Sequence, residues 1–401
     1  MALLPVRDAI ARILDGVTAT DAEPVDLLRA RGRTLASPVA AKLSQPPFDV
    51  SSMDGYAVAA GDVSTVPAEL DCIGESAAGR RFLGTMTSGK CVRIFTGAAI
   101  PDGADAVVIQ EDTAADGNRI TIRETAKLNQ NIRGRGIDFH TGDVLLDEGR
   151  ILDARAITLA ASMAHATLPC RRRPTVAILA TGDELVLPGT PPGPDQIVCS
   201  NSYGLAALVE GAGGVAQVLG IAKDTRASLV EKIALANGAD ILVTTGGASV
   251  GDHDLVAPAL QAAGMTLDFW KIAMRPGKPM MFGRLGTQRV LGLPGNPVSS
   301  MICGRLFLVP LIRRMLGHTN VFDQPAVANV TTGIDANGPR AHYMRATIEP
   351  NRDGLPRVTP VSSQDSSLVS PLAAASCLIV RDIGQPAAKA GDEVQILMLD
   401  F

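Results

Sequence analysis

The sequence predicts a multidomain α/β protein, in which a doubly wound α/β domain is joined to a discontinuous helical domain, an inserted β domain and a C-terminal β-barrel-like domain. Three observations predict it. The 401 residues, 46% of them hydrophobic, are too many for one compact core. Apolar strand-like runs alternate with helical patterns over residues 174–320. Short β-like runs separated by glycine turns fill two further regions of the chain.

Two regions in the first half of the chain, residues 5–32 and 151–168, have helical periodicity. Residues 5–16 predict one helix, and residues 21–32 predict a second, which begins at Asp21 and ends at Gly32. The Pro46-Pro47 pair cannot continue a helix, so the architecture changes near residue 45. Helical spacing returns over residues 151–168, and we expect this segment to pack with residues 5–32. The expected boundaries are 1–44 and 140–173 for the helical domain and 45–139 for the inserted β domain.

Residues 174–320 predict the α/β domain. Nearly continuous apolar strands alternating with helices are typical of a parallel sheet that is covered on both faces. The expected strands are 175–182, 215–222, 239–247, 265–273 and a strand from residue 290, and the expected helices are 200–214, 224–238, 253–264 and one long helix that ends at residue 317. Beyond residue 321 the helical period disappears. Short strands and turns over residues 321–401 predict a compact β domain or barrel.

Composition excludes several classes of protein. The net charge is −4 and aromatic residues make up 3%, whereas nucleic-acid binding favours a basic face and stacking platforms. No run of about eighteen apolar residues is present, so we expect no membrane span. The six cysteines are scattered and form no CxxC pair, which fits a reducing compartment. We therefore expect a soluble cytoplasmic protein that binds neither nucleic acid nor membrane.

The most informative stretch is ILVTTGGASVGDHD at residues 241–254. An apolar strand ends in a Thr245-Gly246-Gly247 loop, and a strand followed by a glycine loop and a helix builds anion pockets in α/β sheets. Asp252 and Asp254 add hard oxygen ligands suited to Mg²⁺ beside a phosphate. The alternative is an ordinary turn with a solvated acidic helix start.

Two more loops are expected at the same edge of the sheet. Thr181, Gly182, Asp183 and Glu184 come at the end of the strand at 175–182 or directly after it. The GLPGNPVSS segment at 292–300 leads from a strand into a helix, and the free N–H groups at the start of that helix are expected to bind an anion. Loops at one edge face one crevice. Unrelated solvated turns and plain helix capping are the alternatives.

Other charged residues fall in turn-prone segments. Lys271, Arg275 and Lys278 in WKIAMRPGKP could meet a phosphate or an oxyanion, although surface cations on an edge hairpin explain them as well. Asp54 and Thr96 lie in separate turns of the β domain. The chain has no Walker A sequence and no G-x-G-x-x-G in a first βα turn, which disfavours common ATPases and Rossmann dehydrogenases.

Eight motifs in order resemble the molybdopterin molybdenumtransferase family, which is related to the E domain of gephyrin. They are SSMDGYAV, RIFTGAAIP, DAVVIQED, RGIDFHTGD, ATGDEL, TTGGASVGDHD, RPGKP and GLPGNPVS, and they span nearly the whole chain. The resemblance implies a transferase that inserts molybdenum from molybdate into adenylylated molybdopterin with release of AMP. It also implies Mg²⁺, a molybdopterin-binding α/β domain, and a homodimer whose cleft lies between the α/β domain of one subunit and the β domain of the other.

The resemblance also assigns roles to individual residues. Those implied to be catalytic are Asp54, Thr96, Asp138, Glu184, Lys271 and Arg275. The resemblance matches Pro294, Pro297 and Ser366 to the family's pterin site. With the loops at the sheet edge, the residues expected to bind the pterin are Thr181, Gly182, Thr245, Gly246, Gly247, Ser249, Pro294, Gly295, Asn296, Pro297 and Ser366. Those implied to hold metal are Asp54, Glu184, Asp224 and Asp254. Two positions depart from the family: Arg275 stands where many members carry lysine, and QDSS at 364–367 replaces Gln-Gly-Ser.

Two rival functions stay open from the sequence. A molybdopterin adenylyltransferase also carries a TTGG loop, but it is a single small domain and lacks the SMDGY and TGAAIP segments. A pterin-binding paralogue without activity, or a scaffold, is the rival outside the enzymes. For the transferase, an adenylyltransferase and proteins that mature molybdoenzymes are the expected partners.

Overall fold

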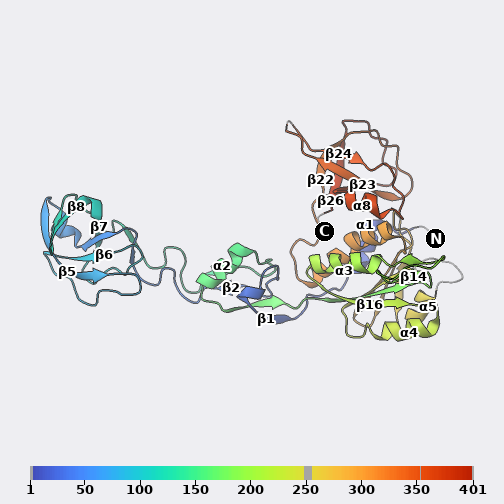
Figure 1. Cartoon of the computed structure of the whole chain (residues 1–401), viewed down its shortest axis with the longest axis horizontal. Coiled ribbons are helices and arrows are strands. Elements are labelled where there is room, and N and C mark those ends of the chain that lie inside the picture. The colour runs from blue at the N-terminus through green and yellow to red at the C-terminus, as the bar shows by residue number, and fades with distance from the viewer. Residues whose placement is uncertain (1–2, 248–254, 353, 400–401) are drawn as a thin grey trace.

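The computed structural model describes residues 3–247, 255–352 and 354–399 as an elongated molecule (Figure 1). A β domain forms one end, a small domain lies in the middle, and the α/β domain forms the other end together with the C-terminal β domain. Among these described residues, no helix is long and apolar enough to cross a membrane.

The N-terminal segment is shared between two cores. Helix α1 (Val6–Leu14) buries Val6, Ala9 and Ile13 in the large core of the α/β domain, and not against residues 151–168 as we expected. The second expected helix is wrong: residues 21–32 form strand β1 (Ala22–Asp26) and the 3₁₀ turn η1 (Leu27–Arg29). Pro24 and the antiparallel pairing of β1 with β12 (Thr167–Arg171) explain the difference, because a proline disfavours the helix and the partner strand is remote in sequence.

The small domain packs around one helix. The expected helix over 151–168 is shorter in the structure, where α2 (Ala154–Ser162) begins after Asp153, whose side chain accepts a hydrogen bond from the Ala156 N–H at 2.8 Å. Strands β2 (Val39–Ala40) and β11 (Val144–Leu146) pair beside it. The buried side chains of this core include Leu35, Leu146 and Leu152.

The β domain is a six-stranded sheet with the order β7-β4-β6-β5-β9-β8. Strands β5 and β6 are parallel, and the other neighbours are antiparallel. Its elements are β4 (Gly55–Val58), η2 (Ala60–Val63), β5 (Ala68–Ser76), β6 (Lys90–Ile94), β7 (Ala106–Ile109), η3 (Gln110–Asp112), β8 (Thr113–Asp116) and β9 (Arg119–Ile122). The short pair β3 (Val50–Ser51) and β10 (Ile132–Arg133) lies where the chain enters and leaves this domain.

The α/β domain has a sheet of order β16-β13-β17-β21-β20-β18. The expectation of a parallel sheet holds for the first four strands, but β20 is antiparallel to β21 and β18 is antiparallel to β20. Strand β20 was not among the expected strands; because it runs antiparallel to both neighbours, β18 keeps the direction of the parallel strands. The strands are β13 (Thr175–Thr181), β16 (Val215–Ala222), β17 (Ile241–Thr245), β18 (Thr266–Trp270), β20 (Met281–Leu285) and β21 (Gln288–Leu293), with a separate parallel pair β14 (Leu185–Val186) and β15 (Ile197–Val198).

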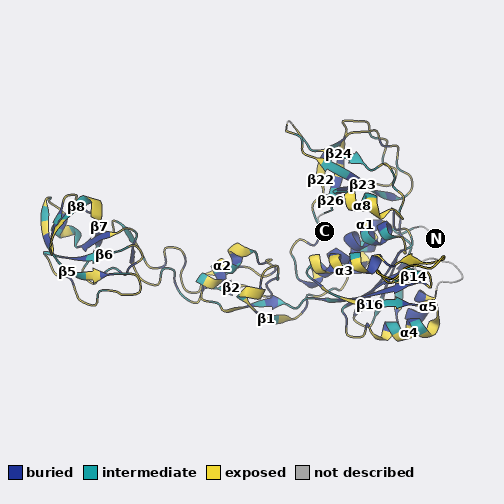
Figure 2. Ribbon diagram, in the orientation of Figure 1, coloured by how far each residue is buried: buried dark blue, intermediate teal, exposed yellow. Residues whose placement is uncertain are grey.

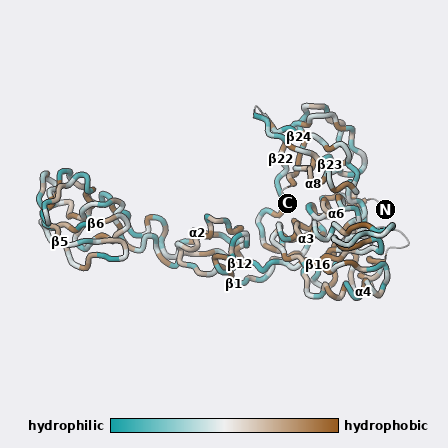
Figure 3. Tube along the Cα trace, viewed as in Figure 1, coloured by the Kyte–Doolittle hydropathy of each residue, from teal (hydrophilic) through white to brown (hydrophobic). Residues whose placement is uncertain are grey.

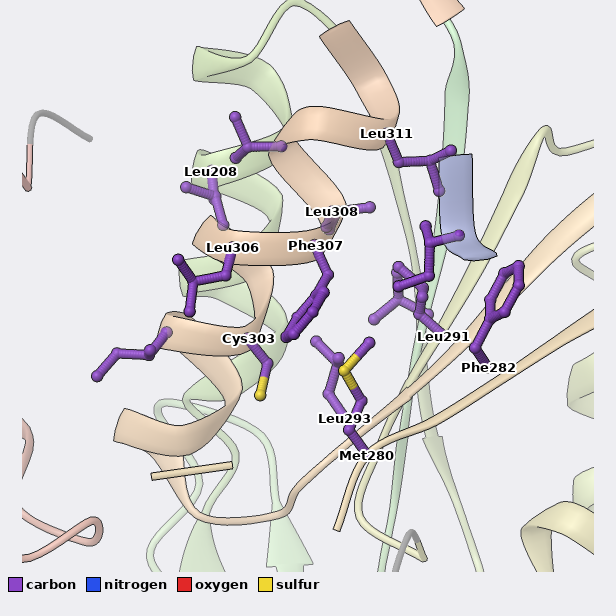
Figure 4. Packing of buried hydrophobic residues seen from close by; sticks show 14 of the residues in the cluster. Leu208, Met280, Phe282, Leu291, Leu293, Cys303, Leu306, Phe307, Leu308 and Leu311 are labelled. Carbon is purple, nitrogen blue, oxygen red and sulfur yellow. The ribbon is translucent and has the colours of Figure 1, made fainter. Parts of the chain in front are cut away.

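Helices cover both faces of this sheet. Helices α4 (Arg226–Ala234) and α5 (Val256–Ala262) bury residues against one face. On the other face lie α1, α3 (Asn201–Gly211), α6 (Pro297–Cys303) and α7 (Val309–Met315). In Figure 4, Leu306 lies beside Leu208 of α3, whereas Phe307 and Leu308 point away from Leu208 toward the side on which Leu291 and Phe282 of the sheet lie. The buried strands stand out in Figure 2 and coincide with apolar stretches in Figure 3.

The long expected helix is interrupted by a π-helical stretch. This stretch, η4 (Gly304–Leu308), joins α6 to α7 directly before Pro310. Proline has no N–H to donate to the preceding turn, so a widened turn there avoids a lost hydrogen bond. The three helical stretches therefore follow one another without an intervening loop.

The C-terminal domain is a closed five-stranded barrel. Strands follow the order β23-β24-β22-β26-β25, and pairing of β25 with β23 closes the ring. Its elements are β22 (Ala326–Val330), β23 (Ala341–Glu349), β24 (Arg357–Pro360), α8 (Val369–Ala374), β25 (Cys377–Arg381) and β26 (Glu393–Met398). Strand β19 (Met274–Arg275) leaves the α/β domain and pairs with β23, so the two domains share a continuous edge.

Candidate functional site

Three loops meet at the carboxyl edge of the α/β sheet, because they follow the neighbouring parallel strands β13, β17 and β21. The Thr181 hydroxyl donates to the Thr245 carbonyl at 3.4 Å. A Cβ atom on Gly246 would lie 2.5 Å from the Thr181 carbonyl oxygen, and one on Gly295 would lie 3.6 Å from the Gly246 Cα. The expected grouping of these loops in one crevice is therefore present in the structure.

Glycine is required in the Thr-Thr-Gly-Gly loop. Gly246 has φ +88° and Gly247 has φ +59°, a region in which L side chains are strained. A Cβ atom on Gly247 would also lie 2.2 Å from a Val256 methyl group. Only glycine therefore lets this loop lie so close to Thr181 and Val256 at the end of β17. Ser249 and Asp254, together with Asp252 and His253, lie outside the described residues.

The Pro-Gly-Asn-Pro turn is held from two sides. The Asn296 side-chain amide donates to the Ser366 hydroxyl at 2.9 Å, and the Val298 N–H donates to the Ser366 carbonyl at 3.1 Å. Ser366 comes from the barrel domain, so the structure places this weakly matched residue beside the turn. The Val298 N–H is already occupied by Ser366, although we expected the free N–H groups of this helix start to bind an anion.

Asn201 is a site residue that the sequence did not single out. It opens α3, it is buried, and its side-chain amide donates to the Gly295 carbonyl at 2.7 Å. Its Oδ1 atom has no hydrogen-bond partner among the described residues. A buried unpartnered acceptor is costly, and here it lies beside the ligand loops. Its position at the start of a helix in an SNSYG turn was the only signal in the sequence.

Two of the expected acidic residues lie at this edge. Glu184 and Asp224 are exposed in the loops after β13 and β16. The Glu184 carboxylate lies over Gly182, since a Cβ atom there would be 2.4 Å from Glu184 Oε2. The Asp224 N–H donates to Asp183 Oδ1 at 3.2 Å, which joins the two loops. An open pocket of about 640 Å³ includes Asp183 and Glu184.

The expected cations lie where the α/β domain meets the barrel. Lys271 follows β18 with φ +75° and donates its N–H to the Met280 carbonyl at 2.8 Å. Arg275 pairs with His342 across β19 and β23, and both residues line a cavity of about 460 Å³ with Arg381. Burial and the neighbouring arginines lower the pKa of His342 to about 4, so its imidazole is neutral at pH 7.

Asp54 and Thr96 form a contact at the far end of the molecule. Asp54 precedes β4 and Thr96 follows β6, and these two strands are neighbours. One Asp54 oxygen accepts the Thr96 N–H at 2.7 Å and the Thr96 hydroxyl at 2.9 Å. These bonds, with a smaller contribution from Arg93, lower the pKa of Asp54. The carboxylate is therefore held ionised and in one orientation.

Arg93 supports that contact, and the sequence did not predict it. Its guanidinium lies over the Tyr56 ring at 5.1 Å and over the Phe95 ring at 4.9 Å. It also donates to the Gly55 carbonyl at 3.2 Å and to the Gln110 side chain at 2.7 Å. An alternating Arg-x-Phe in an ordinary strand gave no distinct signal.

Asp138 lies apart from Asp54 in the chain that returns from the β domain. It is exposed, and its N–H donates to the Gln45 carbonyl at 3.0 Å. No interaction joins its side chain to Asp54 or Thr96 among the described residues. Its place is the junction between the β domain and the small domain.

The structure therefore places the expected residues in two groups at opposite ends of one chain (Figure 1). The small domain separates Asp54, Thr96 and Asp138 from the carboxyl edge of the α/β sheet. The described part of the chain contains no group of three or more histidine, cysteine, aspartate or glutamate side chains able to hold a metal ion. Oxygen donors suit Mg²⁺, but Asp54 does not meet Glu184 or Asp224 within one chain.

Comparison with known proteins decides the family. Residues 4–164 match the MoeA N-terminal region (domains I and II), residues 177–314 match a probable molybdopterin binding domain, and residues 327–399 match the MoeA C-terminal region (domain IV). A molybdopterin molybdenumtransferase of Haemophilus influenzae is 36% identical, with 94% of each chain covered. The chain belongs to the molybdopterin molybdenumtransferase family.

Other relatives agree with this assignment. A molybdopterin molybdenumtransferase from a Nostoc species is 37% identical and covers 94% of this chain and 89% of its own. The crystal structure of a molybdopterin biosynthesis MoeA protein from Pyrococcus horikoshii has a TM-score of 0.89 at 28% identity, with both chains fully covered. The predicted combination of an α/β domain with a C-terminal barrel in a transferase family is thus confirmed.

Proposed function

We propose that this chain inserts molybdenum from molybdate into adenylylated molybdopterin and releases AMP, as the last step of molybdenum cofactor synthesis. One observation carries the proposal. The loops ending β13, β17 and β21 contact one another at the carboxyl edge of the sheet, and Ser366 of the barrel holds the third loop in place. Ligands of open α/β sheets bind at this edge.

The loops have properties suited to the pterin phosphate. Gly246 and Gly247 let the loop pack directly against Thr181 and Val256, where a side chain would not fit. Asn201 Oδ1 offers a buried acceptor that has no partner within the described residues. The Gly246 N–H already donates to the Leu293 carbonyl at 3.3 Å. The Gly247 N–H is therefore the donor of this loop that would bind the phosphate, and the Asn201 acceptor would bind an amino group of the pterin.

The cations at the barrel junction are suited to molybdate or to phosphate oxygens. Arg275 lines a cavity in which His342 is neutral and the adjacent charged groups include Arg381. A guanidinium matches an oxyanion through two parallel hydrogen bonds. We assign Arg275 and Lys271 to the binding of molybdate and of the charge that develops when the anhydride breaks.

A homodimer accounts for the separation of the two groups. The α/β domain that carries the ligand loops lies at the other end of the same chain from the β domain of Asp54 and Thr96. If these two residues take part in the reaction, they must therefore act on a ligand bound at the carboxyl edge of the sheet of a second copy. Symmetric dimers present the same two surfaces twice, so one dimer would contain two such clefts. Asp138 at the domain junction would line the same cleft.

Mg²⁺ belongs to this proposal as an ion shared between two chains. Glu184 and Asp224 of one copy, with Asp54 of the other, offer hard oxygen ligands, and Asp254 is the fourth expected ligand. When bound, Mg²⁺ would polarise the phosphoanhydride. We further propose that the protein acts in the cytoplasm, with an adenylyltransferase and molybdoenzyme-maturation proteins as partners.

The test is AMP release from adenylylated molybdopterin, with and without molybdate and Mg²⁺, combined with reconstitution of a cofactor-free molybdoenzyme. Molybdate-dependent AMP release that reconstitutes the enzyme is the expected result. Tight binding without turnover would identify an inactive paralogue. Formation of the adenylylated pterin from ATP would identify an adenylyltransferase.

A further inference from the structure

A second pocket lies between the small domain and the α/β domain, far from the carboxyl edge. Its volume is about 490 Å³. One wall is the segment 29–34 that follows β1, and the opposite wall comes from Arg173, the end of α3 and the segment after α7. Both domains therefore contribute to the same cavity.

The pocket is strongly basic. Its lining includes five arginines and one histidine, namely Arg29, Arg31, Arg33, Arg173, Arg313 and His318. Glu210 is the one acidic residue in that lining among the described residues. Glu210 is already bound by the Arg173 guanidinium and the Ala216 N–H. Although burial opposes ionisation, these bonds lower the pKa of Glu210, so it remains a carboxylate at neutral pH.

Only some of the arginines in this pocket form ion pairs with carboxylates. Arg33 pairs with Glu23, and Arg313 pairs with Asp323 at 2.9 Å. Arg29 and Arg31 are exposed and have no carboxylate within ion-pair distance in the described part of the chain. The Nε atom of Arg33 is buried without a hydrogen-bond partner. Two cationic side chains and one orphan donor thus remain at the segment 29–34.

His318 shows that the pocket disfavours a further positive charge. Its Nε2 atom lies 2.9 Å from the Thr34 hydroxyl, which joins the two domains. Burial, together with Arg313, lowers the pKa of His318 to about 4. A neutral imidazole can donate to an anion or accept from a hydroxyl, depending on its tautomer.

We propose that this interdomain pocket binds a small phosphate-bearing anion that bridges the small domain to the α/β domain. Guanidinium groups suit phosphate because each offers paired N–H donors at fixed spacing. The bound anion would contact segment 29–34 on one side and the Arg173, Arg313 and His318 side on the other. Binding would therefore fix the angle between the two domains. This last consequence rests on the proposed function, because that angle sets where Asp54 meets a second copy.

The experiment uses pyrophosphate as the probe on the full chain at low ionic strength. Calorimetry gives the affinity, and hydrogen exchange locates the site through protection of residues 29–34 and 313–318. The variant Arg29→Ala/Arg31→Ala should bind at least ~10-fold more weakly, because it removes the two guanidinium groups of this wall that have no carboxylate partner in the described part of the chain. The control Arg352→Ala/Arg357→Ala removes the same charge from the exposed surface of the barrel domain.

The outcomes separate this proposal from the proposed function. Protection of both segments in the control, and its loss in the Arg29→Ala/Arg31→Ala variant, would support the site. Unchanged pyrophosphate affinity in that variant, or protection confined to the carboxyl edge, would overturn it. Arg31→Glu should abolish binding and provides a second variant. Neither calorimetry nor hydrogen exchange requires molybdenum insertion. The interdomain site can therefore be refuted while the transferase activity is present, and it can be supported while that activity is absent.

Discussion

At the scale of single residues, the Asp54–Thr96 contact gives the clearest prediction for pH dependence. Two hydrogen bonds from Thr96 lower the pKa of Asp54, so the carboxylate stays ionised as the pH falls toward the usual aspartate range. Thr96→Val removes the hydroxyl bond and keeps the backbone bond. The pKa should rise, and the acid limb of molybdate-dependent AMP release should move to higher pH. Thr121→Val, in β9 of the same sheet, is the control; an equal movement of its acid limb would contradict the role of Thr96.

Gly246 gives a second prediction at this scale. Gly246→Ala introduces backbone strain at φ +88° and places a methyl group against the Thr181 carbonyl. We expect a loss of about 1–3 kcal/mol in unfolding free energy together with weaker pterin binding. Gly189→Ala is the matched control, because Gly189 has φ +87° but no atom within 4 Å of an added Cβ. Calorimetric unfolding and pterin titration measure both effects. If both variants lose equal stability and neither loses pterin affinity, the close approach to Thr181 does not matter.

At the scale of elements, the join between β12 and β13 depends on an ion pair. Arg172 donates to both oxygens of Asp240 at 2.8 and 2.9 Å, and the Thr175 N–H donates to the same carboxylate at 2.7 Å. Burial opposes ionisation of Asp240, but these bonds outweigh it and lower its pKa. The folded-state pKa lies below the unfolded value, so the pair stabilises above the unfolded pKa, and this stability is lost as the pH falls through the folded pKa.

The corresponding variant is Arg172→Ala. Removing one partner of a charged hydrogen-bonded pair should cost about 1–3 kcal/mol at pH 7. The difference from the unmodified chain should shrink on acidification, as Asp240 becomes protonated in both proteins. Urea unfolding at pH 7 and near pH 3 measures this difference. A difference that stays constant between the two pH values would show that Arg172 acts through packing alone.

The elements also show which parts of the fold could be predicted from sequence. Alternating apolar strands and helices identified the α/β domain, because burial on both faces leaves a local pattern. Strand β1 was mistaken for a helix, since its partner β12 lies more than a hundred residues away in the sequence. Strand β20 was also missed: no strand was predicted over residues 281–285, and it runs antiparallel to both of its neighbours, β18 and β21. Predictions failed where pairing between remote segments overrides local preference.

The candidate site follows the same rule. The loops at the carboxyl edge were predictable, because adjacent parallel strands end at one edge. Asn201 and Arg93 were not, since each acts through a contact with a segment distant in the sequence. The contact between Ser366 and the Asn296 turn depends on how the barrel packs against the α/β domain. No local sequence motif encodes that packing.

At the scale of the whole molecule, the elongated shape leads to a complementation test. In the proposed homodimer, each cleft takes Asp54 from one copy and Glu184 from the other. Asp54→Ala or Glu184→Ala would therefore remove one of the two residues from both clefts. A mixed dimer retains one cleft with both residues intact. After the two inactive proteins are unfolded together and refolded, random pairing in a two-fold dimer should restore roughly a quarter of the normal AMP release. Each variant refolded alone is the control. No recovery in the mixture, with mixed dimers present by mass, would mean that each cleft belongs to one chain.

The position of α1 has a consequence for how the chain is made. Arg289 donates to the Asp15 carbonyl just after this helix, across a separation of 274 residues. At about 5–20 residues per second, the sheet that buries Val6 and Ile13 emerges from a ribosome tens of seconds after the helix does. During that interval the apolar stripe of α1 has no cover, so a nascent chain halted before β20 should bind a holdase chaperone at its beginning. The α/β domain therefore closes only after β21 has been made, 274 residues after Asp15.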